Sequence, residues 1–257
     1  MARMKVGVQL IIWGERGRTN FTQVLDEIAS IGYEGIEAGV PHFENVSDPK
    51  AVLSTRGLLL AGLHMNVGSA DTKAVDEAVS LLGKTGGHYL LFSGAGGKEN
   101  SDENYVKNAA RLEEFGKLAK KQGVMVCYHN HWQEIVDDAR GTRIILENTS
   151  PEHVSLCVDT YWVKCGGMSP VEFIKEYGDR VAYLHLKDGT EEGMKTEPRK
   201  FLELGQGIID FPAIIKAAEP LGVEWLVVEQ DRTERTPKES MAMSRKYLKE
   251  NLGYSRF

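Results

Sequence analysis

The sequence lacks any long hydrophobic run. A membrane-spanning helix needs about 18 or more predominantly apolar residues in succession, and no stretch of the 257 residues approaches that length. Residues 1–14 also lack the pattern of a signal peptide, because their apolar stretch is short and no small-residue cleavage site follows it. We therefore expect no membrane partner and a cytoplasmic location.

Clustered positive charge and paired cysteines are missing as well. The chain has 31 lysine and arginine residues against 37 aspartate and glutamate residues, a formal net charge of -6 at pH 7. Nucleic-acid binding depends on clustered basic residues, and these are scattered, so we expect no nucleic-acid partner. The three cysteines, Cys127, Cys157 and Cys165, show no CxxC spacing, and we interpret them as structural.

Short apolar runs alternate with longer amphipathic stretches along the whole chain. This alternation is typical of repeated βα units around a parallel sheet. The predicted strands are residues 6–12, 35–39, 60–66, 89–94, 124–131, 154–159, 181–188 and 225–230. Helical spacing of apolar residues predicts helices over 19–31 and 104–122, each followed by a glycine. Eight such units predict a (β/α)8 TIM barrel, a fold of the α/β class.

No linker, low-complexity tract or change of composition divides the chain, so we predict one TIM-barrel domain over residues 1–257. The length lies in the usual range for a single barrel. The longest predicted irregular segment is 189–209, which follows the seventh strand. It would form a loop on the rim where barrel enzymes build their sites, and loops of that length are usually functional or mobile.

Acidic, imidazole and amide side chains gather at the C-terminal ends of the predicted strands, the face that carries barrel active sites. They are Glu37, His64, Asn66, His129, Asn130, His131, Asp159, His185, Lys187, Asp188, Glu229, Gln230 and Asp231. Alternate residues of a strand share a face, so His129 lies on the same side as His131. Converging imidazoles and carboxylates suit Mn, Co, Fe, Zn or Mg. Such a metal would polarise a carbonyl or hydroxyl oxygen and ease removal of a neighbouring proton.

Three of these residues favour a functional interpretation. Asp159, His185 and Glu229 each directly follow apolar strand residues, where a buried charge or imidazole is costly unless it is paired or bound to metal. The sequence therefore predicts that these three side chains form a site.

The other candidates have a structural interpretation of similar weight. Glu37, His64 and Lys187 suit either a substrate contact or a salt bridge on the rim. Trp13 would stack on a sugar or close the mouth of the barrel. We interpret the remaining histidines as structural; they are His42, His88 and His153.

The strand-end motifs resemble those of the xylose isomerase-like superfamily of barrels, which contains sugar isomerases, ketose 3-epimerases, inosose dehydratases and AP endonucleases. The motifs are Gly-Tyr-Glu-Gly-Ile-Glu at 32–37, Tyr-His-Asn-His at 128–131, Val-Asp-Thr at 158–160, His-Leu-Lys-Asp at 185–188, Gly-Gln-Gly-Ile-Ile-Asp-Phe at 205–211 and Val-Val-Glu at 227–229. Their order and their placement on strands extend over nearly the whole chain. The resemblance implies a barrel enzyme with a divalent metal ion and a sugar or polyol substrate.

In ketose 3-epimerases of this superfamily, a glutamate, an aspartate, a histidine and a glutamate from strands five to eight hold the metal. The resemblance implies that Asp159, His185 and Glu229 are metal ligands, with Glu229 also the catalytic base. Strand five departs from this pattern, because His129 or a neighbour stands where glutamate is expected. His129 would then be a ligand or a catalytic group, and His131 or Glu134 would carry a proton or contact the substrate.

The predicted function is that of a metal-dependent isomerase or epimerase, which moves a proton on a small sugar or polyol that carries one phosphate or none. A lyase of the inosose dehydratase type begins with the same proton removal, so the sequence does not separate the two, and keto-glycoside processing is a third alternative. An AP endonuclease and a non-catalytic binding barrel are less favoured. Barrels of this group often pair, so a homo-oligomer is an open expectation.

Overall fold

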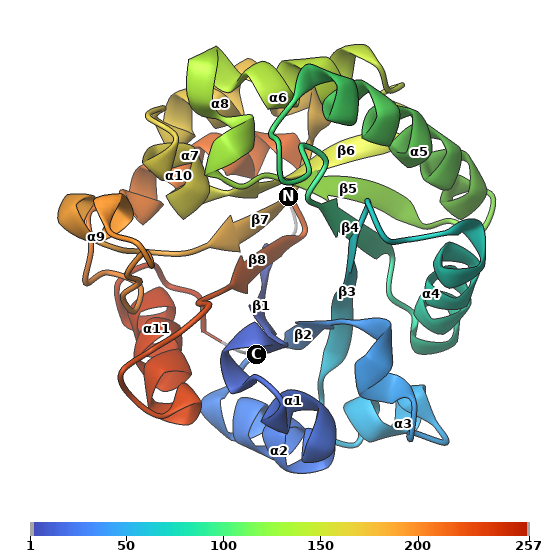
Figure 1. Ribbon diagram of the computed structural model, residues 1–257. Helices are drawn as coiled ribbons and strands as arrows, with labels where there is room; N and C mark the ends of the chain where they lie inside the picture. The colour runs from blue at the N-terminus through green and yellow to red at the C-terminus, as the bar shows by residue number, and fades with distance from the viewer. Residues whose placement is uncertain (1–2, 256–257) are drawn as a thin grey trace.

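The computed structural model describes residues 3–255 and forms a closed barrel of eight parallel strands. The strands are β1 (Lys5–Gln9), β2 (Gly35–Ala38), β3 (Leu59–Asn66), β4 (Tyr89–Ser93), β5 (Met125–His129), β6 (Val154–Asp159), β7 (Val181–Leu186) and β8 (Trp225–Val228). Each strand pairs with the next, and β8 closes the barrel on β1. Figure 1 looks down this barrel, with the helices outside the strands. The predicted (β/α)8 fold is confirmed.

Helices connect the strands and form the outer layer. The α-helices are α1 (Arg16–Thr19), α2 (Phe21–Ile31), α3 (Pro49–Ser54), α4 (Thr72–Thr85), α5 (Asp102–Lys120), α6 (Val136–Glu147), α7 (Thr160–Cys165), α8 (Pro170–Glu176), α9 (Glu191–Lys195), α10 (Phe211–Ala218) and α11 (Pro237–Glu250). Short 3-10 helices are η1 (Leu10–Trp13), η2 (Val40–Phe43), η3 (Trp132–Glu134), η4 (Gly178–Arg180) and η5 (Glu219–Leu221). Within the described residues, no helix is both long enough and apolar enough to cross a membrane.

Several predicted strands extend too far at their C-terminal ends. The first strand ends at Gln9, whose side chain accepts a hydrogen bond from the N–H of Ile11 and so begins η1. Strands β5, β7 and β8 also end early, so that His131, Lys187 and Glu229 lie in the loops directly after them. These residues are held by loop contacts as well as by the sheet.

Side chains fill the interior of the barrel in layers. The apolar layer consists of Ala61, Tyr89, Leu91, Cys127, Cys157, Tyr183, Trp225 and Val227. Gly35 makes room for Trp225, since a Cβ at this position would lie 2.6 Å from the indole. On β5, β6 and β7 the inward positions two residues further along are polar; they are His129, Asp159 and His185. Period-two alternation therefore places a polar layer directly on an apolar one.

Asp188 fastens the segment 189–209 to the barrel. Its carboxylate accepts four backbone N–H groups, from Gly189, Gly205 and Gly207 at 2.9 Å each and from Ile209 at 3.2 Å. The segment was predicted to be irregular, but it contains α9. Its far end is thus held by one buried carboxylate.

We predict that Asp188→Asn destabilises the fold. Each carboxylate oxygen accepts two of the four N–H groups, so in either orientation the new amide N–H2 faces two donors. The free energy of unfolding should fall by about 1–3 kcal/mol, the cost of unsatisfied buried groups. Urea denaturation followed by circular dichroism measures this change.

Asp210→Asn is the matched control. Asp210 caps α10 by accepting the N–H of Ala213 at 3.1 Å, and asparagine caps a helix about as well as aspartate. Its free energy of unfolding should stay near that of the wild type. Equal stability of both variants would show that Asp188 does not hold the segment as described.

Candidate metal centre

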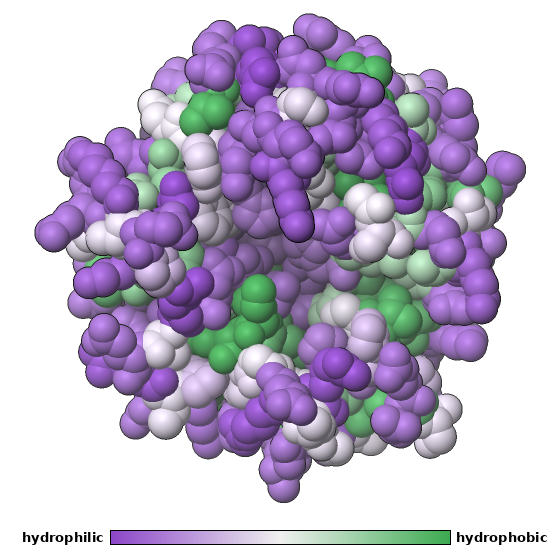
Figure 2. Space-filling view, in the orientation of Figure 1, coloured by the Kyte–Doolittle hydropathy of each residue, from purple (hydrophilic) through white to green (hydrophobic). Residues whose placement is uncertain are grey.

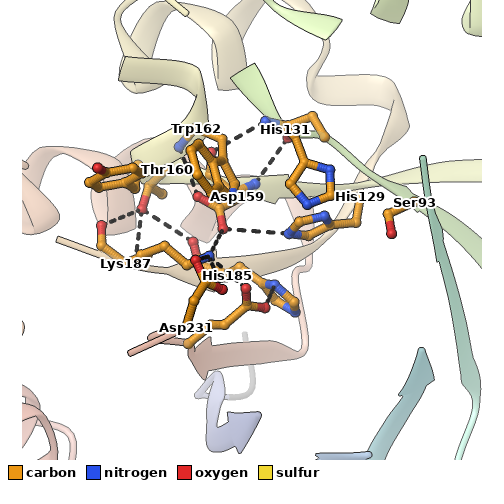
Figure 3. A network of polar contacts seen from close by, with 12 residues as sticks. Ser93, His129, His131, Asp159, Thr160, Trp162, His185, Lys187 and Asp231 are labelled. Atoms are coloured by element: carbon orange, nitrogen blue, oxygen red, sulfur yellow. Dashed lines mark hydrogen bonds and ion pairs between the residues drawn. The ribbon is translucent and has the colours of Figure 1, made fainter. Parts of the chain in front are cut away.

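Four buried side chains converge at the C-terminal end of the barrel. His129 ends β5, Asp159 ends β6, His185 lies in β7 and Glu229 directly follows β8. Each offers one ligand atom, and the four atoms lie within 4.8 Å of one another. Figure 3 shows His129, Asp159 and His185 directed toward the same point. Side chains from four consecutive strands thus meet; the sequence predicted that Asp159, His185 and Glu229 lie together and left the residue from strand five open.

The start of α7 orients Asp159. Its Oδ1 accepts the N–H of Trp162 at 2.9 Å, and its own N–H donates to Oδ1 of Asn130 at 3.0 Å. These bonds leave Oδ2 turned into the barrel, 3.4 Å from Nε2 of His129. One carboxylate oxygen therefore begins a helix, while the other faces the centre.

His185 and Glu229 are each held through the atom that points away from the centre. Nε2 of His185 lies 2.7 Å from Oε2 of Glu37, and Oε1 of Glu229 accepts from Nζ of Lys187 at 2.6 Å. The opposite atoms, Nδ1 of His185 and Oε2 of Glu229, lie 2.6 Å apart. Both inner atoms are consequently available to a shared partner.

The inner atoms lack aligned hydrogen bonds. They are both ring nitrogens of His129, Oδ2 of Asp159, Nδ1 of His185 and Oε2 of Glu229. Buried polar atoms without partners are costly, and two imidazoles with two carboxylates are a common ligand set for a divalent cation. Ligand atoms at about 2.0–2.2 Å from a tetrahedral ion lie roughly 3–4 Å apart, close to the spread seen here. These side chains therefore fit a divalent metal ion.

The electrostatics of the centre agree with that fit at two of the four residues. Burial lowers the pKa of His129 well below its ordinary value, which favours the neutral imidazole. Burial alone would raise the pKa of Glu229, but Lys187 and His185 lower it well below its ordinary value. Metal ligands must be neutral imidazoles and ionised carboxylates. Burial raises the pKa of Asp159 against the pull of Lys187.

A cavity of about 350 Å³ adjoins the centre through two of its side chains, His129 and Glu229. It is lined by Gln9, Ile11, Gly39, His42, His64, Met65, Asn66, Ser93, His129, His131, Glu229 and Asp231. Figure 2 shows a hollow at the centre of the barrel whose surface is largely hydrophilic. Ligand pockets span roughly 300–1,000 Å³, so the volume suits a molecule about the size of one sugar.

The sequence-derived candidates divide between the cavity wall and its surroundings. His64, His129, His131 and Glu229 line the cavity. Trp13 does not, because η1 turns it away and its indole N–H donates to Glu27 at 3.0 Å. The structure thus places Trp13 outside the site.

Glu134 lies behind the cavity wall. It is buried, and its carboxylate accepts the hydroxyl of Tyr128 and the N–H of His131, both at 2.8 Å. This bond to the backbone of His131 fixes the start of η3. Glu134 therefore holds a cavity residue in place without lining the cavity.

Lys187 is fully buried and does not line the cavity either. Its ammonium lies 2.6 Å from Glu229, 3.3 Å from Asp159 and 3.2 Å from Asp231. Glu37 is also fully buried, between two histidines. Both residues contact the converging side chains from outside.

The cavity contains residues to which the sequence argument gave no functional role. Asp231 follows β8 and pairs with Lys187, and Ser93 ends β4 two residues after the inward Leu91. Period-two alternation from Leu91 is a signal that points to Ser93. His42, interpreted as structural, both bonds to Gly39 and lines the cavity.

Comparison with known families agrees with this architecture. The family model described as xylose isomerase-like TIM barrel matches residues 18–250. The chain belongs to this family. An inosose dehydratase of Bacillus cereus (strain AH820) is 27% identical to it, with 97% of this chain and 98% of the relative aligned.

Solved structures share the fold at low sequence identity. A protein named IolI, solved with a bound zinc atom, has a TM-score of 0.75 and 18% identity, with 99% of each chain covered. An L-ribulose 3-epimerase has a TM-score of 0.76 and 17% identity, over 98% of this chain and 94% of its own. At these identities the likeness shows the fold alone.

We predict that Asp159→Asn weakens metal binding without unfolding the chain. Oδ1 of the new asparagine should still cap α7, because asparagine caps a helix about as well as aspartate. The amide nitrogen, however, replaces the inner carboxylate oxygen that would bind the metal. Loss of groups that merely support ligands costs about 10–100-fold in metal affinity, so loss of a ligand should cost at least about 100-fold. Titration of chelator-treated protein with Mn²⁺ measures the affinity.

Asp71→Asn is the control, because Asp71 caps α4 by accepting the N–H of Ala74 at 2.8 Å. It should bind Mn²⁺ like the wild type. Wild-type affinity in Asp159→Asn would remove Asp159 from the ligand set.

Proposed function

We propose that this chain is a divalent-metal-dependent enzyme that moves a proton next to the carbonyl group of a small, neutral, polyhydroxylated compound, as an isomerase or epimerase. The observation that carries the proposal is the convergence of two imidazoles and two carboxylates beside a sugar-sized cavity, whose wall includes His129 and Glu229. The inosose dehydratase relative and the zinc-containing and epimerase structures support this class of chemistry.

His129, Asp159, His185 and Glu229 would hold the cation. When bound, a divalent cation supplies a Lewis acid that makes the hydrogen next to a carbonyl group easier to remove. Glu229 and His131 both line the cavity, and they come from β8 and β5, three positions apart around the closed barrel. In this proposal Glu229 would take a proton from carbon on one side of the substrate, and His131 would give one from the other.

The wall of the cavity favours an uncharged substrate. Within the described part of the chain, the residues that line it include no lysine or arginine, while Glu229 and Asp231 contribute carboxylates. Lys187 is fully buried behind them and already contacts both carboxylates. A phosphate group carries a charge of about -1.5 to -2 and needs cationic partners. An unphosphorylated ketose or keto-polyol therefore fits better than its phosphate ester.

Elimination of water is the second candidate reaction. It starts with the same proton removal, and it needs an acid for the departing hydroxyl instead of a second group that exchanges protons with carbon. Two observations favour it: His129 stands where the related 3-epimerases have a glutamate, and the inosose dehydratase relative is 27% identical over 97% of this chain. Product analysis separates the two, because elimination yields an absorbing unsaturated ketone.

We predict that Glu229→Gln abolishes proton exchange. An amide cannot accept the proton from carbon, and positioned acid–base groups contribute about 10²–10⁴-fold to rate. The measurement is uptake of solvent deuterium into ketoses and keto-inositols, followed by NMR, with circular dichroism to verify the fold.

Glu224→Gln is its matched control, because Glu224 precedes the other end of β8 and bonds to Lys5 and Tyr89. It should exchange at the wild-type rate. Near-normal exchange in Glu229→Gln would remove Glu229 from the catalytic role.

We also predict a preference for neutral substrates. The kcat/KM for a ketose should exceed that for its phosphate ester by at least about 100-fold, since a phosphate would lie against two carboxylates without a cation to pair with it. Parallel kinetics on both forms of each active ketose measure the ratio. A preference for the ester would contradict the proposed selection of uncharged substrates.

A further inference from the structure

The carboxylate of Glu37 lies within hydrogen-bond distance of two imidazoles. Its Oε2 lies 2.7 Å from Nε2 of His185, and its Oε1 lies 3.0 Å from Nδ1 of His64. The carboxylate is fully buried and does not line the cavity. It therefore lies between one candidate metal ligand and one residue of the cavity wall, and contacts both.

The contact with His185 decides which ring nitrogen faces the metal centre. An ionised carboxylate only accepts hydrogen bonds, so Nε2 of His185 must carry a proton to bond with Glu37. In the neutral imidazole, Nδ1 is then the nitrogen with a free lone pair. Nδ1 is the atom that points toward Oε2 of Glu229. Glu37 thus selects the form of His185 that can coordinate a cation.

The contact with His64 decides what that residue presents to the cavity. Nδ1 of His64 must likewise donate to Glu37, which leaves Nε2 as an acceptor in the neutral ring. Nε2 lies 3.1 Å from the hydroxyl of Ser93, and both His64 and Ser93 line the cavity. The single lone pair of Nε2 then accepts the hydroxyl hydrogen of Ser93, and the oxygen of Ser93 is left as the acceptor that a substrate hydroxyl meets at this wall.

We propose that Glu37 is a positioning residue that sets both imidazoles: it turns the coordinating nitrogen of His185 toward the cation and keeps Nε2 of His64 an acceptor on the cavity wall. The inference rests on the proposed metal centre. Carboxylates that accept the outer N–H of a metal-bound histidine fix its orientation and raise its basicity as a ligand. Here the same carboxylate extends this control to the cavity wall through His64.

The isosteric variant Glu37→Gln tests the inference. Glutamine has one acceptor oxygen, so its N–H2 must face either His185 or His64, and that imidazole must then take its other form. We expect Co²⁺ affinity to fall about 10–100-fold, with altered visible absorption of the Co²⁺ complex. Nitrogen NMR of histidine-labelled protein should show a changed protonation pattern at His185 or His64.

Two further variants complete the design. Glu113→Gln is the control. Glu113 lies on α5, outside the barrel, and its carboxylate lies 2.8 Å from Nδ1 of His153. This variant should bind Co²⁺ like the wild type. Glu37→Asp keeps the charge but withdraws it by one methylene, so its Co²⁺ affinity should fall too. It serves as the test if Glu37→Gln does not fold.

The outcomes are distinguishable. Weaker Co²⁺ binding in a folded Glu37 variant, with Glu113→Gln unchanged, supports the inference. Wild-type affinity and absorption in a folded Glu37 variant overturn it and leave the proposed metal centre standing. Failure of the wild type itself to bind Co²⁺ overturns the metal centre and this inference together.

Discussion

Closure of the barrel is the constraint on which the site depends. Eight parallel strands direct alternate side chains inward, and the last inward positions of β5, β6 and β7 are His129, Asp159 and His185. No side chain in that layer can turn away without breaking the strand that carries it. On an open sheet, water could satisfy each of these polar groups separately. Inside the closed barrel they lie next to one another, and only hydrogen bonds or a cation can satisfy them.

Charge explains how that layer tolerates burial. Asp159 and Glu229 carry two negative charges, which a divalent cation would balance, and Lys187 stands behind them with Asp231 as a further partner. Two of the supporting contacts use the atom that points outward, while Lys187 also lies 3.3 Å from the inner Oδ2 of Asp159. Oδ1 of Asp159 caps α7, and Nε2 of His185 contacts the carboxylate of Glu37. The inner atoms are thus left without aligned hydrogen bonds, which suits ligation of a cation.

The sequence predicted the barrel and the convergence because both follow from periodicity. Alternating strands and helices define the fold, and period two puts Asp159 and His185 on the inner face. Contacts between segments that are distant in the sequence could not be predicted from periodicity. The pairing of Trp13 with Glu27 depends on η1, which a cap by Gln9 creates where a longer strand was expected. The burial of Glu37 between His64 and His185 depends on the closing of the barrel, which brings β2, β3 and β7 together.

The residue at the end of β5 bears most directly on the reaction. The resemblance to ketose 3-epimerases implies three carboxylates and one imidazole around the metal, whereas His129 leaves two carboxylates here. A divalent cation held by two carboxylates keeps no excess negative charge, so it would draw electrons from a carbonyl group more strongly. Histidine at this position would also leave one of two like acid–base groups out, so that Glu229 and His131, which both line the cavity, would act on a substrate as unlike partners. If the two sides of the substrate are served differently, as proposed, the residue at the end of β5 would decide whether proton removal is followed by return to carbon or by loss of a hydroxyl.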